Sequence, residues 1–269
     1  MELRNPNKSH YPLILELLNR SFQPAWPAQA VADKIYYEPH YDPSHVWMAR
    51  EEGKVLGFLV TTLYEDKAWL KLLVVAPEAR RQGLGRDMLS RAEYRLSGEG
   101  AKSMHVEGTP PFEFLPGVAP NSEADLFFRS QGYRATPVQV TWVPPHVGPQ
   151  PEVLGFERKA AATFAHAHAG KAWPWVEETL GSHPPRMVFE EGRGLCLAEP
   201  GVSIGPLWMD SGADNGADKR LIVRARGLAG EACADPRGLR FWQLPGSAPW
   251  PPDMPSTVQD FFSFSKTLA

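Results

Sequence analysis

Residues 74–85 read VVAPEARRQGLG, and this stretch decides the fold of the first half of the chain. It begins as an apolar strand and passes through a proline into a turn that contains Gly83 and Gly85. A strand that runs through a glycine turn into a helix directs backbone N–H groups and the positive end of the helix dipole at one point, which is an arrangement that binds phosphate. The glycines remove the Cβ atoms that would hold a phosphate away from those amides. Three arginines supply counter-charge: Arg80, Arg81 and Arg86.

Three phosphate-binding motifs can be compared with this turn. The dinucleotide fingerprint requires a third glycine where the chain has Met88, and the triphosphate loop requires a Gly-Lys pair followed by Ser or Thr, which is absent. The pattern V-x-P-x-x-R-x-x-G-x-G is complete. Its residues are Val75, Pro77, Arg80, Gly83 and Gly85. The remaining alternative is an ordinary surface loop that carries two glycines by chance.

Hydrophobic periodicity around the turn predicts an α/β fold with a mixed sheet flanked by helices and a right-handed crossover at the glycine turn. The apolar run over residues 68–77 is typical of a strand covered on both faces, at the centre of a sheet. The expected elements are a strand at 1–5, helices at 9–22 and 29–37, a hairpin over 45–64, the strand at 68–77, a helix ending at Gly98, a strand at 102–108 and a helix over 122–131.

The complete turn motif resembles that of the GNAT superfamily of acetyl-CoA-dependent N-acetyltransferases. A second resemblance lies in residues 121–133, NSEADLFFRSQGY, which are similar to the pattern N-x-x-A-x-x-x-Y-x-x-x-G-F of that family's closing helix. The resemblance covers residues 1 to about 143, so an N-terminal GNAT domain is expected over residues 1–135.

The resemblance implies a site for acyl-CoA and no metal. The pantetheine arm is expected to bond the backbone of Leu73 and Val75, and the pyrophosphate to lie on the amides of residues 81–86. A backbone N–H near Val74 is expected to stabilise the oxyanion of the tetrahedral intermediate. The implied binding residues are Leu73, Val74, Val75, Arg80, Arg81, Gln82, Gly83, Leu84, Gly85, Arg86, Asn121 and Phe128.

The catalytic residues depart from the family pattern. Phe128 stands where many relatives place a tyrosine that protonates the leaving thiolate, although a thiol pKa near 8.5 makes CoA a tolerable leaving group without it. Lys71 lies in the stretch where many relatives place a glutamate base. On the following strand Glu107 and His105 are the candidate bases, with Glu65 and Asp66 as weaker alternatives.

An offset of 134 residues aligns the second half with the first, which we interpret as a tandem duplication, with chance similarity of two α/β stretches as the alternative. Residues 207–210 (LWMD) fall under 73–76 (LVVA), and Phe261 and Phe262 fall under residues 127 and 128. We therefore expect a tandem GNAT protein with a degenerate C-terminal copy over 136–269, in which the strand at 136–143 can belong to either half. In this copy the loop 210–218 carries three carboxylates that would repel a pyrophosphate: Asp210, Asp214 and Asp218.

Composition narrows the functional classes. The formal charge is −3 and no polybasic cluster occurs, which argues against nucleic acid as a partner. No run approaches the roughly 18 apolar residues of a membrane span, so a soluble, cytoplasmic protein without a membrane partner is expected. Cys196 and Cys233 fit no disulfide framework or metal motif, and His166 and His168 are interpreted as helix surface.

The sequence thus predicts an acetyltransferase that moves acetyl from acetyl-CoA to a primary amine of a small molecule by direct attack in a ternary complex. A non-catalytic acyl-CoA-binding or interaction module is one alternative, motivated by the missing tyrosine and the unassigned base. Acetylation of a peptide or protein is another. Whether the chain forms an oligomer stays open.

Overall fold

The structure is a computed structural model, and it divides the chain into two compact units. The first unit comprises residues 1–139 and 260–269, and the second comprises residues 140–259. Two long strands, β6 (Arg134–Val143) and β11 (Thr257–Thr267), contribute residues to both units. The described residues are 1–22, 28–36, 40–106, 117–145, 157–169, 177, 186–190, 193–199, 203–209, 213, 216–230, 239–241 and 247–268.

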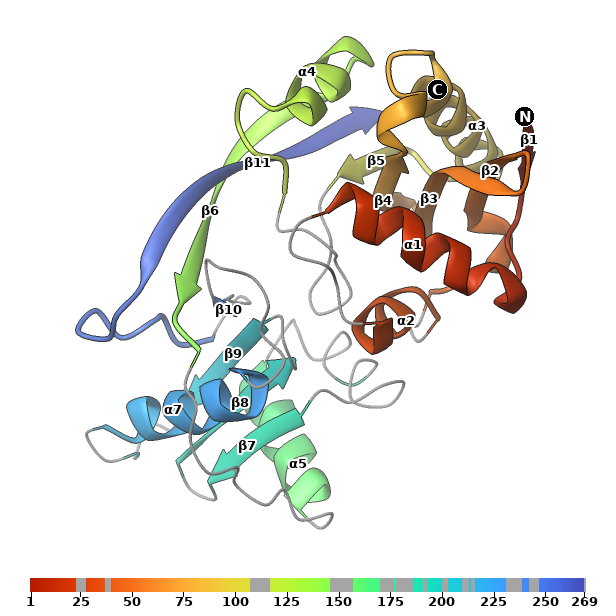
Figure 1. The fold of residues 1–269 in the computed structure, drawn as a ribbon. Helices are drawn as coiled ribbons and strands as arrows, with labels where there is room; N and C mark the ends of the chain where they lie inside the picture. The colour runs from red at the N-terminus through yellow and green to blue at the C-terminus, as the bar shows by residue number, and fades with distance from the viewer. Residues whose placement is uncertain are drawn as a thin grey trace. The chain divides into compact units, whose positions relative to one another are not determined.

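The sheet of the first unit has the strand order β1-β2-β3-β4-β5-β11-β6 (Figure 1). Strands β1 to β4 form an antiparallel run, β5 is parallel to β4, and β11 is antiparallel to β5. The predicted mixed sheet is therefore present. Besides β6 and β11, the strands of this sheet are β1 (Glu2–Arg4), β2 (Val46–Glu51), β3 (Lys54–Tyr64), β4 (Lys67–Val75) and β5 (Ser103–Val106).

Helices α1 and α3 cover opposite faces of β3 and β4, with α1 in front of the strands and α3 behind them in Figure 1. Gly57 on β3 lets α3 approach closely, because a Cβ there would lie 2.7 Å from the sulfur of Met88. The apolar stripe of each amphipathic helix is buried against the sheet. The helices of this unit are α1 (Tyr11–Ser21), α2 (Ala28–Tyr36), α3 (Leu84–Gly98) and α4 (Glu123–Ser130), and the short 3-10 turns are η1 (Lys8–His10), η2 (Pro43–His45) and η3 (Pro77–Ala79).

Most of the elements expected from the sequence are confirmed within two residues at each end. The hairpin of β2 and β3 turns through Glu52 and Gly53, both with positive φ (47° and 83°), as a two-residue hairpin requires. The helix expected over 9–22 begins later, at Tyr11, because residues 8–10 form the 3-10 turn η1 that Asn7 caps. The crossover from β4 through α3 to β5 joins two parallel strands, as predicted.

The C-terminal strand differs from what the repeat alignment suggested. The offset of 134 places Phe261 and Phe262 under helical residues, yet both lie in β11. Pairing explains the difference, since β11 covers the edge of β5 through the register Phe264↔Val106. Phe264 is fully buried and packs on Phe128 with ring centroids 5.5 Å apart, which holds the strand in the core of the first unit.

The second unit has the strand order β6-β10-β9-β8-β7, with residues 141–143 of β6 antiparallel to β10. Strands β7, β8 and β9 form an antiparallel run, and β10 is parallel to β9. Cys196 on β8 is buried, and burial raises the pKa of its thiol to about 12. The elements of the second unit are α5 (Glu157–Ala169), β7 (Arg186–Glu190), β8 (Gly194–Glu199), β9 (Ser203–Met209), α7 (Ala217–Gly230) and β10 (Leu239–Phe241).

Candidate functional site

The turn between β4 and α3 presents an uncapped helix N-terminus. Gly83 is the N-cap of α3 and adopts a left-handed conformation with φ of 87°, and no side chain caps the helix. The first N–H groups of an α-helix have no partner within the helix. Two residues earlier, Arg81 also has a positive φ of 60°, which turns its backbone out of the strand direction. The turn therefore exposes a set of amide donors together with the positive end of the α3 dipole.

The end of β4 is an open sheet edge. The N–H of Ala76 donates to the carbonyl of Leu56 at 2.8 Å, and the antiparallel register pairs Phe58 with Val74. Because bonded and non-bonded pairs alternate, the backbone of Val74 faces β3, whereas the N–H and C=O groups of Leu73 and Val75 face the opposite edge. Among the described residues β5 pairs with only the first three residues of β4, so this opposite edge has no strand partner after Trp69.

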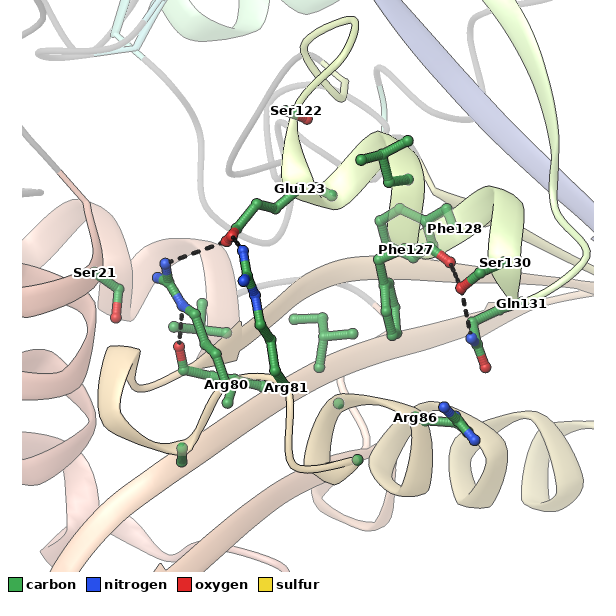
Figure 2. Close-up of a pocket in the computed structure, with 18 of the residues that line it drawn as sticks. Ser21, Arg80, Arg81, Arg86, Ser122, Glu123, Phe127, Phe128, Ser130 and Gln131 are labelled. Carbon is green, nitrogen blue, oxygen red and sulfur yellow. Dashed lines mark hydrogen bonds and ion pairs between the residues drawn. The ribbon is translucent and has the colours of Figure 1, made fainter.

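The strand edge, the turn and the start of α3 border one cavity of about 720 Å³, shown in Figure 2. Helix α4 forms its other wall with Phe127 and Phe128, and the C-terminal end of α1 closes it with Ser21 and Phe22. All of the lining residues belong to the first unit. Those expected from the sequence are Leu73, Val74, Val75, Arg80, Arg81, Gly83, Gly85, Arg86 and Phe128.

Three residues expected to bind the coenzyme do not line this cavity. Gln82 donates its side-chain N–H to the carbonyl of Glu78 at 2.9 Å, and the side chain of Leu84 is buried in the core. Asn121 has a positive φ of 60° and donates its backbone N–H to Asp125 Oδ2 at 2.9 Å. This hydrogen bond joins the loop before α4 to the first turn of the helix.

Several residues line the cavity that were not among the binding residues expected from the sequence. Those on α4 follow from helical periodicity, because Glu123, Phe127 and Ser130 recur on one face of a helix that was predicted. No local signal points to Ser21 and Phe22, which approach the cavity only through the packing of α1 on the sheet. The lining residues missed are Ser21, Phe22, Ala79, Ser122, Glu123, Ala124, Leu126, Phe127, Ser130 and Gln131.

Charged side chains meet across the mouth of the cavity. Figure 2 shows Arg80 and Arg81 reaching from the turn to Glu123 on α4. Arg81 Nη2 lies 2.7 Å from Glu123 Oε1, and Arg80 Nη1 lies 3.7 Å from Oε2. The hydrogen bond and charge of Arg81, with the charge of Arg80, hold the pKa of Glu123 below its ordinary value. Arg86 makes no ion pair with any described residue.

His105 lies where β4 and β5 stop pairing. It is opposite Trp69 in the parallel register, and the two ring centroids are 4.8 Å apart. Its Nε2 lies 3.0 Å from the hydroxyl of Ser103, so this hydrogen bond orients the ring. The other candidate base, Glu107, lies outside the described residues. Glu65 and Asp66 are in the β3–β4 turn, at the end of β4 away from the cavity.

Among the described residues that line the cavity, no tyrosine is present to act as the acid. Phe128 lines it, and the nearest tyrosine in the sequence motif is Tyr133. The Tyr133 hydroxyl donates to Glu93 Oε1 at 2.7 Å. Burial, the negative charge of Glu93 and this hydrogen bond raise the pKa of Tyr133 above its ordinary value. Its proton is therefore held within the core.

Within the described part of the chain, no group of three His, Cys, Asp or Glu side chains could hold a metal ion. On α5 the ring of His168 stacks on Phe164 with centroids 4.0 Å apart, and His166 is exposed, in keeping with a helix surface. None of the helices that the structure describes has the length and hydrophobicity of a membrane crossing. Asp210 and Asp214 of the predicted acidic loop lie outside the described residues.

Comparison with known proteins identifies a GNAT domain. Residues 11–113 match the Acetyltransferase (GNAT) family. A GCN5-related N-acetyltransferase from Sphaerobacter thermophilus is similar in structure, with a TM-score of 0.61, 16% identity and coverage of 99% of this chain and 95% of that one. The glucosamine N-acetyltransferase region of a fungal multi-domain β-N-acetylglucosaminidase has a TM-score of 0.64 and 13% identity, over 98% of this chain and 38% of that one. No curated protein sequence matches the chain. At these identities the structural likeness shows the fold alone, and the similarity to the Acetyltransferase (GNAT) family is to residues 11–113.

Proposed function

We propose that the GNAT domain, residues 1–135 completed by strand β11, transfers an acetyl group from acetyl-CoA to a primary amine by direct attack. The observation that carries this proposal is the single cavity that joins the open edge of β4 to the uncapped N-terminus of α3. The open edge of β4 matches the amide-containing arm of CoA, and the N-terminus of α3 matches its diphosphate. The cavity volume of about 720 Å³ lies within the range of natural ligand sites.

The backbone supplies the recognition. The pantetheine amides pair with the outward N–H and C=O groups of Leu73 and with the N–H of Val75, as an added strand would. The carbonyl of Val75 accepts a hydrogen bond from Arg80 Nε at 3.1 Å. The diphosphate lies on the amides that follow Gly83, and Arg86 adds a cation that no described protein group engages. The side chains of Gln82 and Leu84, and the backbone N–H of Asn121, support the turn and the neighbouring loop rather than touching the coenzyme.

The reaction begins with the amine nitrogen attacking the thioester carbonyl carbon. An outward N–H of β4, from Leu73 or Val75 beside Val74, stabilises the oxyanion of the tetrahedral intermediate. The carbon–sulfur bond then breaks and CoA leaves as a thiolate, whose pKa near 8.5 permits departure without an acid in the position of Phe128. The products are an acetamide, CoA and one proton.

Before the attack the acceptor ammonium gives one proton to a base, because only the neutral amine has the lone pair that attacks. The second proton leaves the nitrogen as the intermediate collapses and protonates the CoA thiolate. His105 is our candidate base, because it lies at the point where β4 and β5 separate and its ring is oriented by Ser103. His105 does not line the cavity, so the proton would reach it through water. Glu107, two residues further on, is the alternative.

We propose a small-molecule amine as the acceptor, since the net charge of −3 and the absence of a basic or acidic run leave no docking surface for a charged protein tail. The fungal region of similar fold is described as a glucosamine N-acetyltransferase, which is an acetyltransferase for an amino sugar. An amine of a peptide or protein is the competing class of acceptor, and the assay described below tests both classes.

We further propose that residues 136–269, apart from the ends of β6 and β11 that belong to the first unit, are a degenerate second copy that does not bind CoA. The order of β7, β8, β9, α7 and β10 repeats that of β2, β3, β4, α3 and β5, including the parallel pairing of the last two strands. Gly216 has φ of 96° directly before α7, as Gly83 has before α3. The carboxylates of residues 210–218 are expected to repel a diphosphate there.

The test combines binding and turnover. Calorimetry should detect CoA binding, and a thiol reagent should detect CoA released from acetyl-CoA only when an amine is present. Gly83→Glu should abolish binding, because a side chain in the left-handed position is strained and its carboxylate opposes the diphosphate. Asp214→Ala is the matched control in the second copy and should bind as the wild type does.

The outcomes separate the three candidate functions. Release of CoA with free amines supports the proposal, and transfer to peptides alone supports a peptide acetyltransferase. Tight CoA binding without turnover on a broad amine panel indicates a non-catalytic module, which the phenylalanine at position 128 favours. A wild-type protein that binds no CoA would overturn the assignment of the cavity.

A further inference from the structure

The mouth of the cavity contains an acidic side chain that the proposed ligand does not need. Glu123 lines the cavity together with Arg80 and Arg81, and its carboxylate contacts both guanidinium groups. Two arginines beside an uncapped helix N-terminus are chemically suited to a phosphate oxygen. In this structure a protein carboxylate takes that position.

The position of Glu123 in its own helix does not explain this contact. Ser122 caps α4 by accepting a hydrogen bond from the N–H of Asp125, and Asp125 already supplies an acidic group in the first turn. Glu123 instead extends away from α4 and across the cavity to the turn, as Figure 2 shows. Its contacts thus connect two walls of the cavity and do not stabilise one of them internally.

We propose that Glu123 is a carboxylate latch that competes with the diphosphate of the coenzyme for Arg80 and Arg81. This inference rests on the proposed function, and it names the residue that sets the affinity of the site for ligands that carry a diphosphate. Binding requires the arginines to exchange the carboxylate for phosphate oxygens. The carboxylate is then left beside a group of the same charge and moves away from the turn.

The latch is weak enough to open. The side chains of Arg81 and Glu123 are 85% and 63% exposed, so water and salt screen their attraction. Ion pairs of this kind contribute little to stability. A diphosphate carries more charge than one carboxylate and also bonds the backbone amides after Gly83, which Glu123 does not contact. The coenzyme therefore displaces the latch, at the expense of part of its binding free energy.

Removing the charge should increase affinity. For Glu123→Gln we expect a Kd for CoA about two- to tenfold lower than that of the wild type, because exposed ion pairs and like charges are of that strength. The affinity for pantetheine, which lacks the diphosphate, should stay unchanged. The ratio of the wild-type and variant Kd values for CoA should approach one as the salt concentration rises.

Glu78→Gln is the matched control. Glu78 lies in the turn that carries Arg80 and Arg81, and its side chain is exposed to an extent similar to that of Glu123. It pairs with Arg20 at 3.0 Å, but it does not line the cavity. This variant should bind CoA and pantetheine as the wild type does. Thermal unfolding of both variants should resemble that of the wild type, since both carboxylates are exposed.

Each outcome bears on the latch separately from the proposed function. Weaker or equal CoA binding by Glu123→Gln, with a wild type that binds CoA, would overturn the latch and make Glu123 a residue that positions the arginines. An equal gain for pantetheine would overturn it as well. If neither protein binds CoA, the site assignment and the latch both fail, whereas binding by the variant alone would support the latch in its strongest form.

Discussion

Gly83 and Gly85 are both required in the proposed site, but for different physical reasons. Gly83 has open space where a Cβ would lie, and its φ of 87° is what excludes other residues. Gly85 lies within α3, where a Cβ would meet Val75 Cγ2 at 3.5 Å and Phe127 at 3.7 Å, which are ordinary contact distances. The fold itself would therefore accept a methyl group at position 85, and we infer that the reason for glycine there lies in the cavity.

This difference leads to a prediction for Gly85→Ala. The variant should unfold at the same temperature as the wild type or slightly higher, since alanine favours the helix over glycine by up to about 1 kcal/mol. Its affinity for CoA should fall roughly tenfold or more, because the methyl group displaces a phosphate oxygen from a charge-assisted hydrogen bond. Calorimetry and thermal unfolding measure the two effects.

Gly98→Ala is the control on the same helix, because it has open space around it and does not line the cavity. It should show the same small gain in stability with unchanged CoA affinity. A loss of stability in Gly85→Ala would mean that glycine is needed there for packing.

At the scale of the element, Asp125 joins α4 to the loop before it and, through Arg129, to the C-terminal strand. Burial of Asp125 by itself would raise the pKa of its carboxyl, but the N–H of Asn121 and the guanidinium of Arg129 bring that pKa below its ordinary value of 3.8. Arg129 Nε lies 2.6 Å from the carboxylate, and the guanidinium lies over the ring of Phe262 on β11, 5.0 Å from its centroid. One carboxylate thus connects the loop before α4, the helix and, through Arg129, the C-terminal strand.

The lowered pKa determines how stability depends on pH. A group whose pKa is lower in the folded state stabilises the protein fully above its unfolded pKa, and this contribution is lost as the pH falls through the folded pKa. Asp125→Asn should therefore lower the free energy of unfolding at pH 7, and the difference from the wild type should shrink as the pH falls below about 4. Urea unfolding at several pH values measures this, and a difference independent of pH would contradict it.

Local sequence was sufficient to predict α4 and the turn, because their signals lie within a few residues. Ser122 as cap, the periodic apolar residues and Gly132 after the last turn are all local features. The contact of Glu123 with Arg81 could not be predicted in this way, since 42 residues separate the two along the chain. The same holds for Ser21, which reaches the cavity only because α1 packs on the sheet.

At the scale of the whole molecule, the first unit is discontinuous in sequence. Its sheet includes β11, which comes from the C-terminal end of the chain and pairs with β5, and Phe264 is buried in its core. Without this strand the edge of β5 and the ring of Phe128 would be exposed to water. The first 145 residues alone therefore lack part of their core.

A fragment of residues 1–145 should consequently fail to unfold cooperatively, and it should bind no CoA. Joining residues 257–268 to it through a flexible linker should restore both properties. In the full-length chain Phe264→Ala should lower stability by about 3–5 kcal/mol, as is usual for a buried phenylalanine. Circular dichroism with urea unfolding measures each change, and cooperative unfolding of the short fragment would disprove the dependence on β11.

The sequence by itself determined the local elements of the first unit, the glycine turn and the fold class, because hydrophobic periodicity, capping residues and backbone conformation act over a few residues. Only the tertiary structure decided which strand completes the sheet, which residues wall the cavity and which carboxylate faces the arginines. These contacts join residues that are far apart in the chain, and their free energy arises from packing and pairing that no local pattern encodes. The final strand illustrates this limit, since its phenylalanines aligned with a helix in the sequence and were drawn into a strand by the unpaired edge of β5.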